Sequence, residues 1–180
     1  MTTNIEITNQ ALAEIGSRSQ ITSMTDGSQE ALYANLIYNP LRDFLLREGD
    51  YDWSLQSVAI GPSGTAQLPW NYQYGYPGVA LRIRQLVPLV YDPLDPRPVS
   101  WNVVASSPTG PRVIVSKEAM SQVIYTASVI EDDWDPIFRE AFVRLLGSVL
   151  ALAIESNLPF SQSRLVEAID FAGIANLRDA

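Results

Sequence analysis

The sequence predicts an α+β fold that is mainly a helical bundle of about four helices, with a small antiparallel β insertion between helices 2 and 3. Two observations lead to this fold class. Four segments, two near each end of the chain, carry apolar residues at helical spacing: residues 4–15, 28–48, 135–155 and 163–177. Between the second and third of them, residues 51–130 hold short alternating segments separated by loops rich in glycine and proline.

The chain is long enough for a substantial core, and we expect residues 1–180 to form a single domain. Its helical bundle would comprise residues 1–48 and 134–180, and residues 51–130 would form a β-rich lobe. Hydrophobic residues make up 47% of the chain and charged residues 18%, which is typical of a globular protein. The N-terminus lacks the features of a signal peptide and no apolar run is long enough to span a bilayer, so we expect no membrane contact.

Composition also excludes several function classes. The chain contains no cysteine and no histidine, which excludes disulfides, thiol nucleophiles, Cys/His zinc sites and a Ser-His-Asp triad. Its formal net charge is −8, so its average surface would repel nucleic acid. The sequence assigns no catalytic, cofactor-binding or metal-binding residue, and the favoured expectation is a protein that is not an enzyme.

The most apolar helix is predicted to begin at Asp135, whose carboxylate can cap the first N–H groups, with Pro136 at the first helical position. Apolar pairs then recur every four residues up to Ile154, which gives an apolar face wider than that of an ordinary surface helix. The remaining face ends in small residues, namely Gly147, Ser148 and Ala151. We expect another helix to pack closely there, within the bundle or from a neighbouring subunit.

The first two helices follow from similar patterns. Gly16 is expected to end the first helix in a left-handed turn, and Asp26 or Ser28 to cap the second. Pro40 lies inside the second helix and predicts one kinked helix, because the apolar spacing continues across it. The apolar positions of this helix are Leu32, Tyr33, Leu36, Ile37, Leu41, Phe44 and Leu45.

The last helix is predicted after a break at Asn157–Pro159. Ser161 or Ser163 would open it. Its apolar face comprises Leu165, Val166, Ile169 and Ala172. Residues 172–180 are expected to be weakly constrained.

Five segments of the β-rich lobe have the residue types of strands. The first lies within residues 53–60, and the second, residues 79–90, alternates apolar residues with Arg82 and Arg84. Three shorter candidates follow at residues 100–105, 112–116 and 122–129. Together they predict a small antiparallel meander.

Carboxylates are densest at Glu131, Asp132, Asp133 and Asp135. One hypothesis is a site for calcium or magnesium, which prefer oxygen ligands. The alternative is a helix N-terminus, where the helix dipole favours negative charge by about 0.3–1 kcal/mol per group. Because the spacing is not that of a calcium-binding loop, we favour the structural interpretation.

Trp70, Tyr72, Tyr74 and Tyr76 alternate strictly, so on a strand all four rings would face one side. Such a row could stack on single-stranded nucleic acid or on sugars. No basic residue lies within residues 62–80, so we favour packing on the adjacent helices or on another protein chain.

Arg82, Arg84, Arg97 and Arg112 could form a modest basic patch on the β-rich lobe. The acidity of the chain favours instead a solvated strand face or salt bridges between subunits. The glycine-containing residues 61–64 lack the spacing and the lysine of a phosphate-binding loop.

Four segments, taken in order, resemble a known family. They are ALAEIG, NPLRDFLLREGDYDWS, LPWNYQYGYPG followed by LRIRQL, and WDPIFREAFVRLLGSVLALAI. This order is similar to that of the head-to-tail adaptor proteins of tailed bacteriophages, which include the tail tubular protein A class and related head-completion proteins. Trp53 matches a tryptophan common in the family, and its DP-x-F-x-x-A helix opening is matched by Asp135, Pro136, Phe138 and Ala141.

The resemblance spans residues 11–154 and implies a structural virion protein of the neck, or connector, that is made in the host cytoplasm. It would form a ring, usually of twelve subunits, that binds the portal protein and a downstream tail or nozzle protein. DNA would pass through the channel without specific binding. Gly78 departs from the family, which commonly has an acidic residue after the proline matched by Pro77.

Two other functions stay open from the sequence. Glu131 and Asp133 could hold a metal in a small carboxylate-dependent hydrolase or lyase. Alternatively, residues 70–76 could form an aromatic surface that binds carbohydrate or peptide. The adaptor is the favoured hypothesis, because the order of the four segments supports it and no enzyme motif is present.

Overall fold

The computed structural model describes residues 2–90, 99–155 and 158–178. The chain divides into two compact units, which we name the helical unit and the β unit. The helical unit comprises residues 1–54 and 129–180, and the β unit comprises residues 55–128. None of the described helices is both long and apolar enough to cross a bilayer.

The predicted fold class is wrong, because the protein is not mainly a helical bundle with a small β insertion. Among the described residues, six strands form two three-stranded antiparallel sheets. These strands build a compact unit with a hydrophobic core of its own. The strands are short and lie between loops rich in glycine and proline, so their apolar periodicity is much weaker than that of the helices. For this reason the sequence leads to an underestimate of the size of the β unit.

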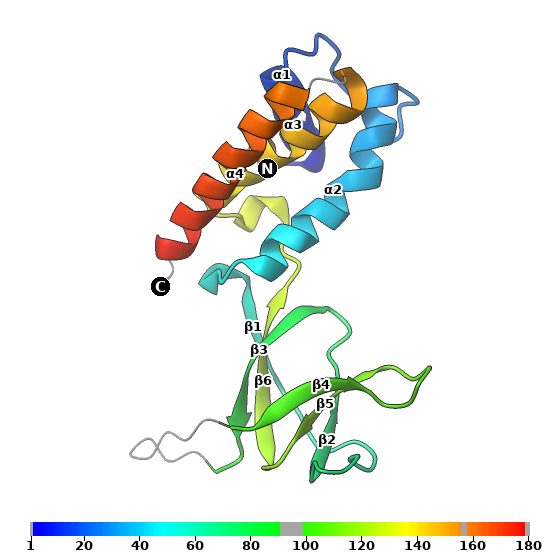
Figure 1. Ribbon diagram of the computed structural model, residues 1–180, viewed down its shortest axis with the longest axis vertical. Helices are drawn as coiled ribbons and strands as arrows, with labels where there is room; N and C mark the ends of the chain where they lie inside the picture. Colours follow the sequence, from blue (N-terminus) through cyan, green and yellow to red (C-terminus); the bar gives the residue numbers. More distant parts are fainter. Residues whose placement is uncertain (1, 91–98, 156–157, 179–180) are drawn as a thin grey trace. The chain divides into compact units, whose positions relative to one another are not determined.

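The described part of the helical unit contains four α-helices and two short 3₁₀ helices. Their bounds are α1 Asn4–Glu14, α2 Gln29–Glu48, η1 Asp52–Ser54, η2 Glu131–Asp133, α3 Pro136–Glu155 and α4 Leu158–Arg178. Helix α3 packs against each of the other three helices, and Figure 1 shows it among them. It buries side chains on most sides, as its wide apolar face predicts: Phe138, Ala141, Phe142, Val143, Leu145, Leu146, Leu150 and Ala151.

The ends of α1 and α2 confirm the predicted capping. Gly16 has a φ of 81°, the left-handed conformation that ends a helix. Ser28 caps α2, because its side chain accepts a hydrogen bond from the Ala31 N–H at 3.1 Å. Asp26 supports the cap by accepting from the Ser28 hydroxyl at 2.6 Å. Hydrogen bonds from Ser28 and from the Thr22 N–H lower the pKa of Asp26 to about 2.

Helix α2 runs through Pro40, which confirms one helix rather than two. Pro40 is exposed, so water can hydrate the carbonyl group that lacks a helical N–H partner. The predicted start of α4 is wrong, because the helix begins at Leu158 and not at Ser161 or Ser163. Pro159 is tolerated there because the first turn of a helix needs no N–H donor from it.

The β unit is built from two sheets with non-sequential strand order. Strand bounds are β1 Leu55–Ala59, β2 Tyr72–Gly75, β3 Ala80–Pro88, β4 Trp101–Ala105, β5 Arg112–Ser116 and β6 Met120–Ala127. One sheet has the order β1-β6-β3 and the other β2-β5-β4. The predicted meander is therefore wrong: β6 pairs with two strands that precede it by long connections, and among the sheet neighbours only β4 and β5 follow one another directly in the chain (Figure 1).

Both sheets contribute to the core of the β unit. Tyr74 and Ile114 come from one sheet, and Ile83, Val123 and Tyr125 from the other. Strand β3 buries every third residue, at Ala80, Ile83 and Leu86. Its pairing with β6 shifts register near Arg82 and Arg84, and such bulges replace the simple alternation of a regular strand.

Candidate functional site

The acidic segment before α3 is a structural feature of the helical unit. Asp135 accepts hydrogen bonds from the N–H groups of Ile137 and Phe138, at 2.8 and 3.3 Å, so the predicted cap is confirmed. Glu131 accepts from the Tyr38 hydroxyl at 3.2 Å. No group of three or more metal-ligating residues occurs in the described part of the chain. The metal-site hypothesis for Glu131 and Asp133 therefore gains no support from the structure.

The tyrosines that the sequence places on one strand face lie in or against the β core. Tyr74 is fully buried, and its hydroxyl oxygen accepts from the Met120 N–H at 2.8 Å. Tyr72 and Tyr76 pack against the same core, and Trp70 precedes β2 rather than belonging to it. A stacking surface made of these four rings does not form, because the Tyr74 ring is fully buried. The alternation of rings reflects one strand face that points into a core.

Tyr74→Phe is expected to destabilise the β unit by about 1–3 kcal/mol, because it leaves the buried Met120 N–H without its acceptor. Tyr72→Phe makes the same chemical change at a half-buried ring and is expected to cost less than about 0.5 kcal/mol. Urea unfolding followed by circular dichroism measures both variants. Equal costs would show that the Tyr74 hydroxyl is not the important group.

The predicted basic patch is spread over two sheets. Arg82 and Arg84 lie on β3, and the Nε of Arg84 donates to Thr126 Oγ1 at 2.6 Å. Arg112 lies on β5 of the other sheet, with its guanidinium carbon 4.4 Å from the Tyr76 ring centroid. Arg97 falls outside the described residues. Two of these arginines thus have intramolecular partners that account for their positions.

An aromatic cluster around Phe138 forms the centre of the helical unit. The ring centroid of Phe138 lies 5.0 Å from those of Tyr51 and Trp53 and 5.1 Å from that of Trp134. The ring pairs are edge-to-face, an arrangement that adds about 0.5–1.5 kcal/mol per pair beyond burial. Two features of the family resemblance, Trp53 and the segment that begins at Asp135, therefore meet in one core. Their role is structural.

Tyr38 joins this cluster to the acidic segment. Its ring lies 5.0 Å from that of Phe142, and its hydroxyl donates to Glu131. Burial, followed by the negative charge of Glu131, raises the pKa of the Tyr38 hydroxyl far above its usual value. Tyr38 therefore stays neutral and acts as a hydrogen-bond donor that orients Glu131.

An apolar ridge lies on α2, formed by Leu32, Leu36, Pro40 and Phe44, which we name the α2 ridge. The three large side chains are 67%, 70% and 58% exposed, in that order along the chain. Residues four apart are neighbours on a helix surface, so the ridge is continuous. The side chains that α2 buries are instead Ala31, Ala34, Tyr38 and Leu46. Apolar periodicity alone could not separate the two faces, because alanine and tyrosine make the core contacts.

A second exposed apolar surface lies on α4, formed by Leu165, Val166 and Ile169, which we name the α4 ridge. These side chains are 43%, 59% and 63% exposed. The sequence identifies this apolar face, but the face does not point into the core. Ala168 is the one buried side chain among residues 161–173 of α4.

The small-residue face of α3 receives α1, as the sequence predicts for a contact within the bundle. Ser148 and Ala151 are buried. A methyl group placed on Gly147 would lie 3.5 Å from the Ala11 carbonyl oxygen and 3.5 Å from Ile15 Cγ2. Ser148 satisfies its own hydroxyl by donating to the Leu145 carbonyl at 2.7 Å.

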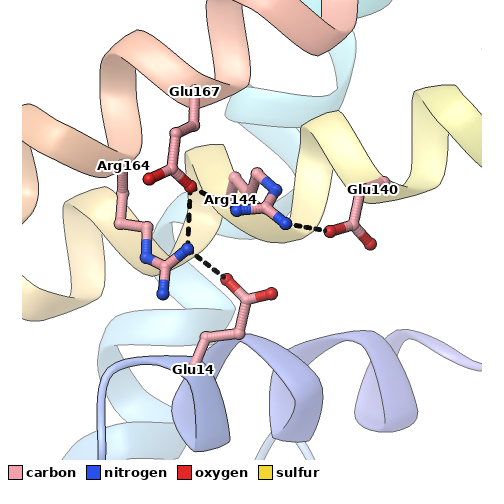
Figure 2. A network of polar contacts seen from close by, with 5 residues as sticks. All are labelled: Glu14, Glu140, Arg144, Arg164 and Glu167. Atoms are coloured by element: carbon pink, nitrogen blue, oxygen red, sulfur yellow. Dashed lines mark hydrogen bonds and ion pairs between the residues drawn. The ribbon is translucent and has the colours of Figure 1, made fainter.

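A network of charged side chains joins α1, α3 and α4 (Figure 2). Arg144 on α3 pairs with Glu140 at 2.5 Å and with Glu167 on α4. Arg164 on α4 pairs with Glu167 at 2.8 Å and with Glu14 on α1 at 3.7 Å. The spacings Glu140–Arg144 and Arg164–Glu167 are visible in the sequence as helical pairs, whereas the links between helices require the fold.

The network shifts the pKa values of Arg144 and Glu167. Burial by itself would lower the pKa of Arg144, but the hydrogen bonds and negative charges of its carboxylate partners, Glu140 first, together outweigh it, and the pKa is raised. Burial likewise acts to raise the pKa of Glu167, and the hydrogen bonds from Arg164 and Arg144 lower it overall. Both shifts favour the charged forms of Arg144 and Glu167.

In comparisons with known proteins, the chain matches no protein-family model and no curated protein.

Proposed function

We propose that this protein is a structural adaptor of the neck of a tailed bacteriophage. Copies of the chain would form a ring, of twelve subunits by the family resemblance, beneath the portal protein. The ring would extend the DNA channel and dock a downstream tail or nozzle protein. The protein would act in the virion after assembly in the host cytoplasm.

The observation that carries this proposal is the pair of exposed apolar ridges on the helical unit. Leu36 and Ile169 are each more than 60% exposed, although both lie on helices whose other faces pack on α3. Contiguous exposed apolar surface is typical of protein–protein contact sites. An interface between copies in which one ridge meets a different surface of the next copy can close into a ring.

The core of the helical unit also supports the resemblance to adaptors. Phe138 and Ala141, from the segment that resembles the family, are fully buried, and Trp53 packs on Phe138. These residues hold η1 and α3 together rather than forming a reaction site. A protein whose motif residues all serve packing fits a structural role.

Charge is distributed unevenly between the units. The helical unit has 7 arginines and 17 aspartates or glutamates, which gives it a formal charge of −10. The β unit has 5 basic and 3 acidic residues, which gives it a formal charge of +2. Affinity for DNA comes chiefly from cationic contacts with phosphates. A channel lined by the helical unit would therefore let DNA pass without binding it.

The experiment that tests the proposal combines the purified protein with the portal protein of the phage or prophage that encodes it. Native mass spectrometry and electron microscopy would detect a ring of this chain on the portal. Rings that form only on the portal are compatible with the proposal. A chain that neither binds portal nor forms rings under any condition would contradict it.

Leu36→Asp is expected to reduce assembly on the portal by at least about tenfold, because it places a charge in the centre of the α2 ridge. Asn35→Asp is the matched control, since it introduces the same carboxylate at a neighbouring exposed position of α2. Both variants should retain the circular dichroism spectrum of the parent. Loss of assembly in both variants, or in neither, would exclude the α2 ridge as the contact surface.

A further inference from the structure

Helix α4 presents an unusual face to the rest of the helical unit. Its large apolar side chains Leu165, Val166 and Ile169 are exposed. The described side chains on the opposite face are Arg164, Glu167, Ala168 and Phe171. Ala168 is buried and Phe171 is half-buried, so this face combines apolar contacts with charged ones. The charged contacts add to the packing of α4 on α3.

Two of the ion pairs connect α4 to other helices, and both depend on it being docked. Glu167 binds Arg144 of α3, and Arg164 binds Glu14 of α1 (Figure 2). The guanidinium carbon of Arg144 also lies 4.8 Å from the ring centroid of Phe171, a cation–π contact. Arg144 of α3 thus makes two specific contacts to α4.

These contacts differ from the core of the unit in their response to solvent. The side chains of Arg144 and Glu167 are 18% and 38% exposed, so salt reaches the pair. Partly exposed ion pairs are weakened by screening, whereas the contacts of Phe138 and Phe142 with other rings are not. A helix held in part by charge can open locally while a core held by apolar packing stays folded.

We infer that Glu14, Arg144, Arg164 and Glu167 form an electrostatic latch that holds α4 on α1 and α3, and that α4 undocks as a unit when the latch is screened or broken. Undocking leaves the cluster around Phe138 intact, because none of its rings belongs to α4. The released helix carries the α4 ridge with it. The latch is a property of the single chain and does not depend on the proposed function.

Hydrogen exchange measured by mass spectrometry on the full chain tests the latch, with peptides of α3 as the internal reference. Raising salt from about 0.01 M to about 1 M shortens the Debye length from about 30 Å to about 3 Å. Exchange in α4 is expected to accelerate about fivefold over this range, while exchange in α3 changes little. Glu167→Gln should produce a similar acceleration at low salt and remove most of the salt effect.

Asp170→Asn is the matched control, because it removes an exposed carboxylate from the same helix three residues away. It is expected to leave exchange in α4 within about twofold of the parent. Three results would overturn the latch: equal salt responses of α3 and α4, equal effects of Glu167→Gln and Asp170→Asn, or an α4 that is already fully exchanged at low salt. A selective, salt-dependent acceleration in α4 that Glu167→Gln reproduces would support it.

Discussion

Phe138→Ala is expected to destabilise the helical unit by about 3–5 kcal/mol, because truncation of a buried phenylalanine loses apolar burial and leaves a cavity. The ring of Phe138 is fully buried and contacts the rings of Tyr51, Trp53 and Trp134. The three neighbours are large and come from two segments, Tyr51 and Trp53 from the segment at η1 and Trp134 from the residue after η2, so they cannot easily collapse into the space. Urea unfolding followed by circular dichroism and by the fluorescence of the tryptophans gives the change in the free energy of unfolding.

Phe44→Ala is the control for this variant, because it makes the same chemical change at a side chain that is 58% exposed. It is expected to cost less than about 1 kcal/mol in the isolated chain. If the two variants were equally destabilised, the cluster around Phe138 would not be the centre of the unit. If Phe44→Ala destabilised the chain strongly, the α2 ridge would have a partner within the chain.

Helices α1, α2 and α3 could be predicted from the sequence because at least one end of each carries a local start or stop signal. Ser28 and Asp135 cap helices where the sequence places them, and Gly16 ends α1 in the expected conformation. These signals act over a few residues and need no knowledge of the fold. The start of α4 was misplaced because Pro159 indicates a break, yet a proline in the first turn is compatible with a helix.

The β unit could not be predicted to the same extent. Strand β6 pairs with β1 and β3, and nothing in a single sequence specifies pairings between segments so far apart. The bulges of β3 also turn a simple alternation into burial of every third residue. Tyr74 illustrates the consequence: a row of aromatic residues that suggests an exposed surface is the interior face of a strand.

The exposed ridges and the latch were missed for a related reason. Leu32 and Leu36 have the spacing of core residues, and only the fold shows that Ala31, Ala34 and Tyr38 take that role. When both faces of a helix are apolar, its sequence does not show which face packs against the rest of its own chain. The ion pairs between α4 and its neighbours similarly arise from helix packing, not from a sequence motif.

Gly49→Ala is expected to destabilise the helical unit by about 3 kcal/mol, the upper part of the usual range for overpacking a core. Gly49 has an ordinary φ of −80°, so backbone conformation does not require glycine. The requirement is space: a methyl group there would lie 2.7 Å from the Tyr51 hydroxyl oxygen and closer still to two carbons of its ring. Tyr51 is fully buried and packs on Phe138 and Trp53, so the ring can move only by disturbing the cluster.

Gly147→Ala adds the same methyl group inside α3 and isolates this steric effect. Its nearest neighbours, the Ala11 carbonyl oxygen and Ile15 Cγ2, would lie at an ordinary contact distance of 3.5 Å. The variant is therefore expected to stabilise the unit by about 0.5–1 kcal/mol through helix propensity. Thermal or urea unfolding should move the two variants in opposite directions. A stable Gly49→Ala variant would mean that Tyr51 has an alternative buried position, and a destabilised Gly147→Ala variant would mean that α1 packs on α3 more tightly than a methyl group allows.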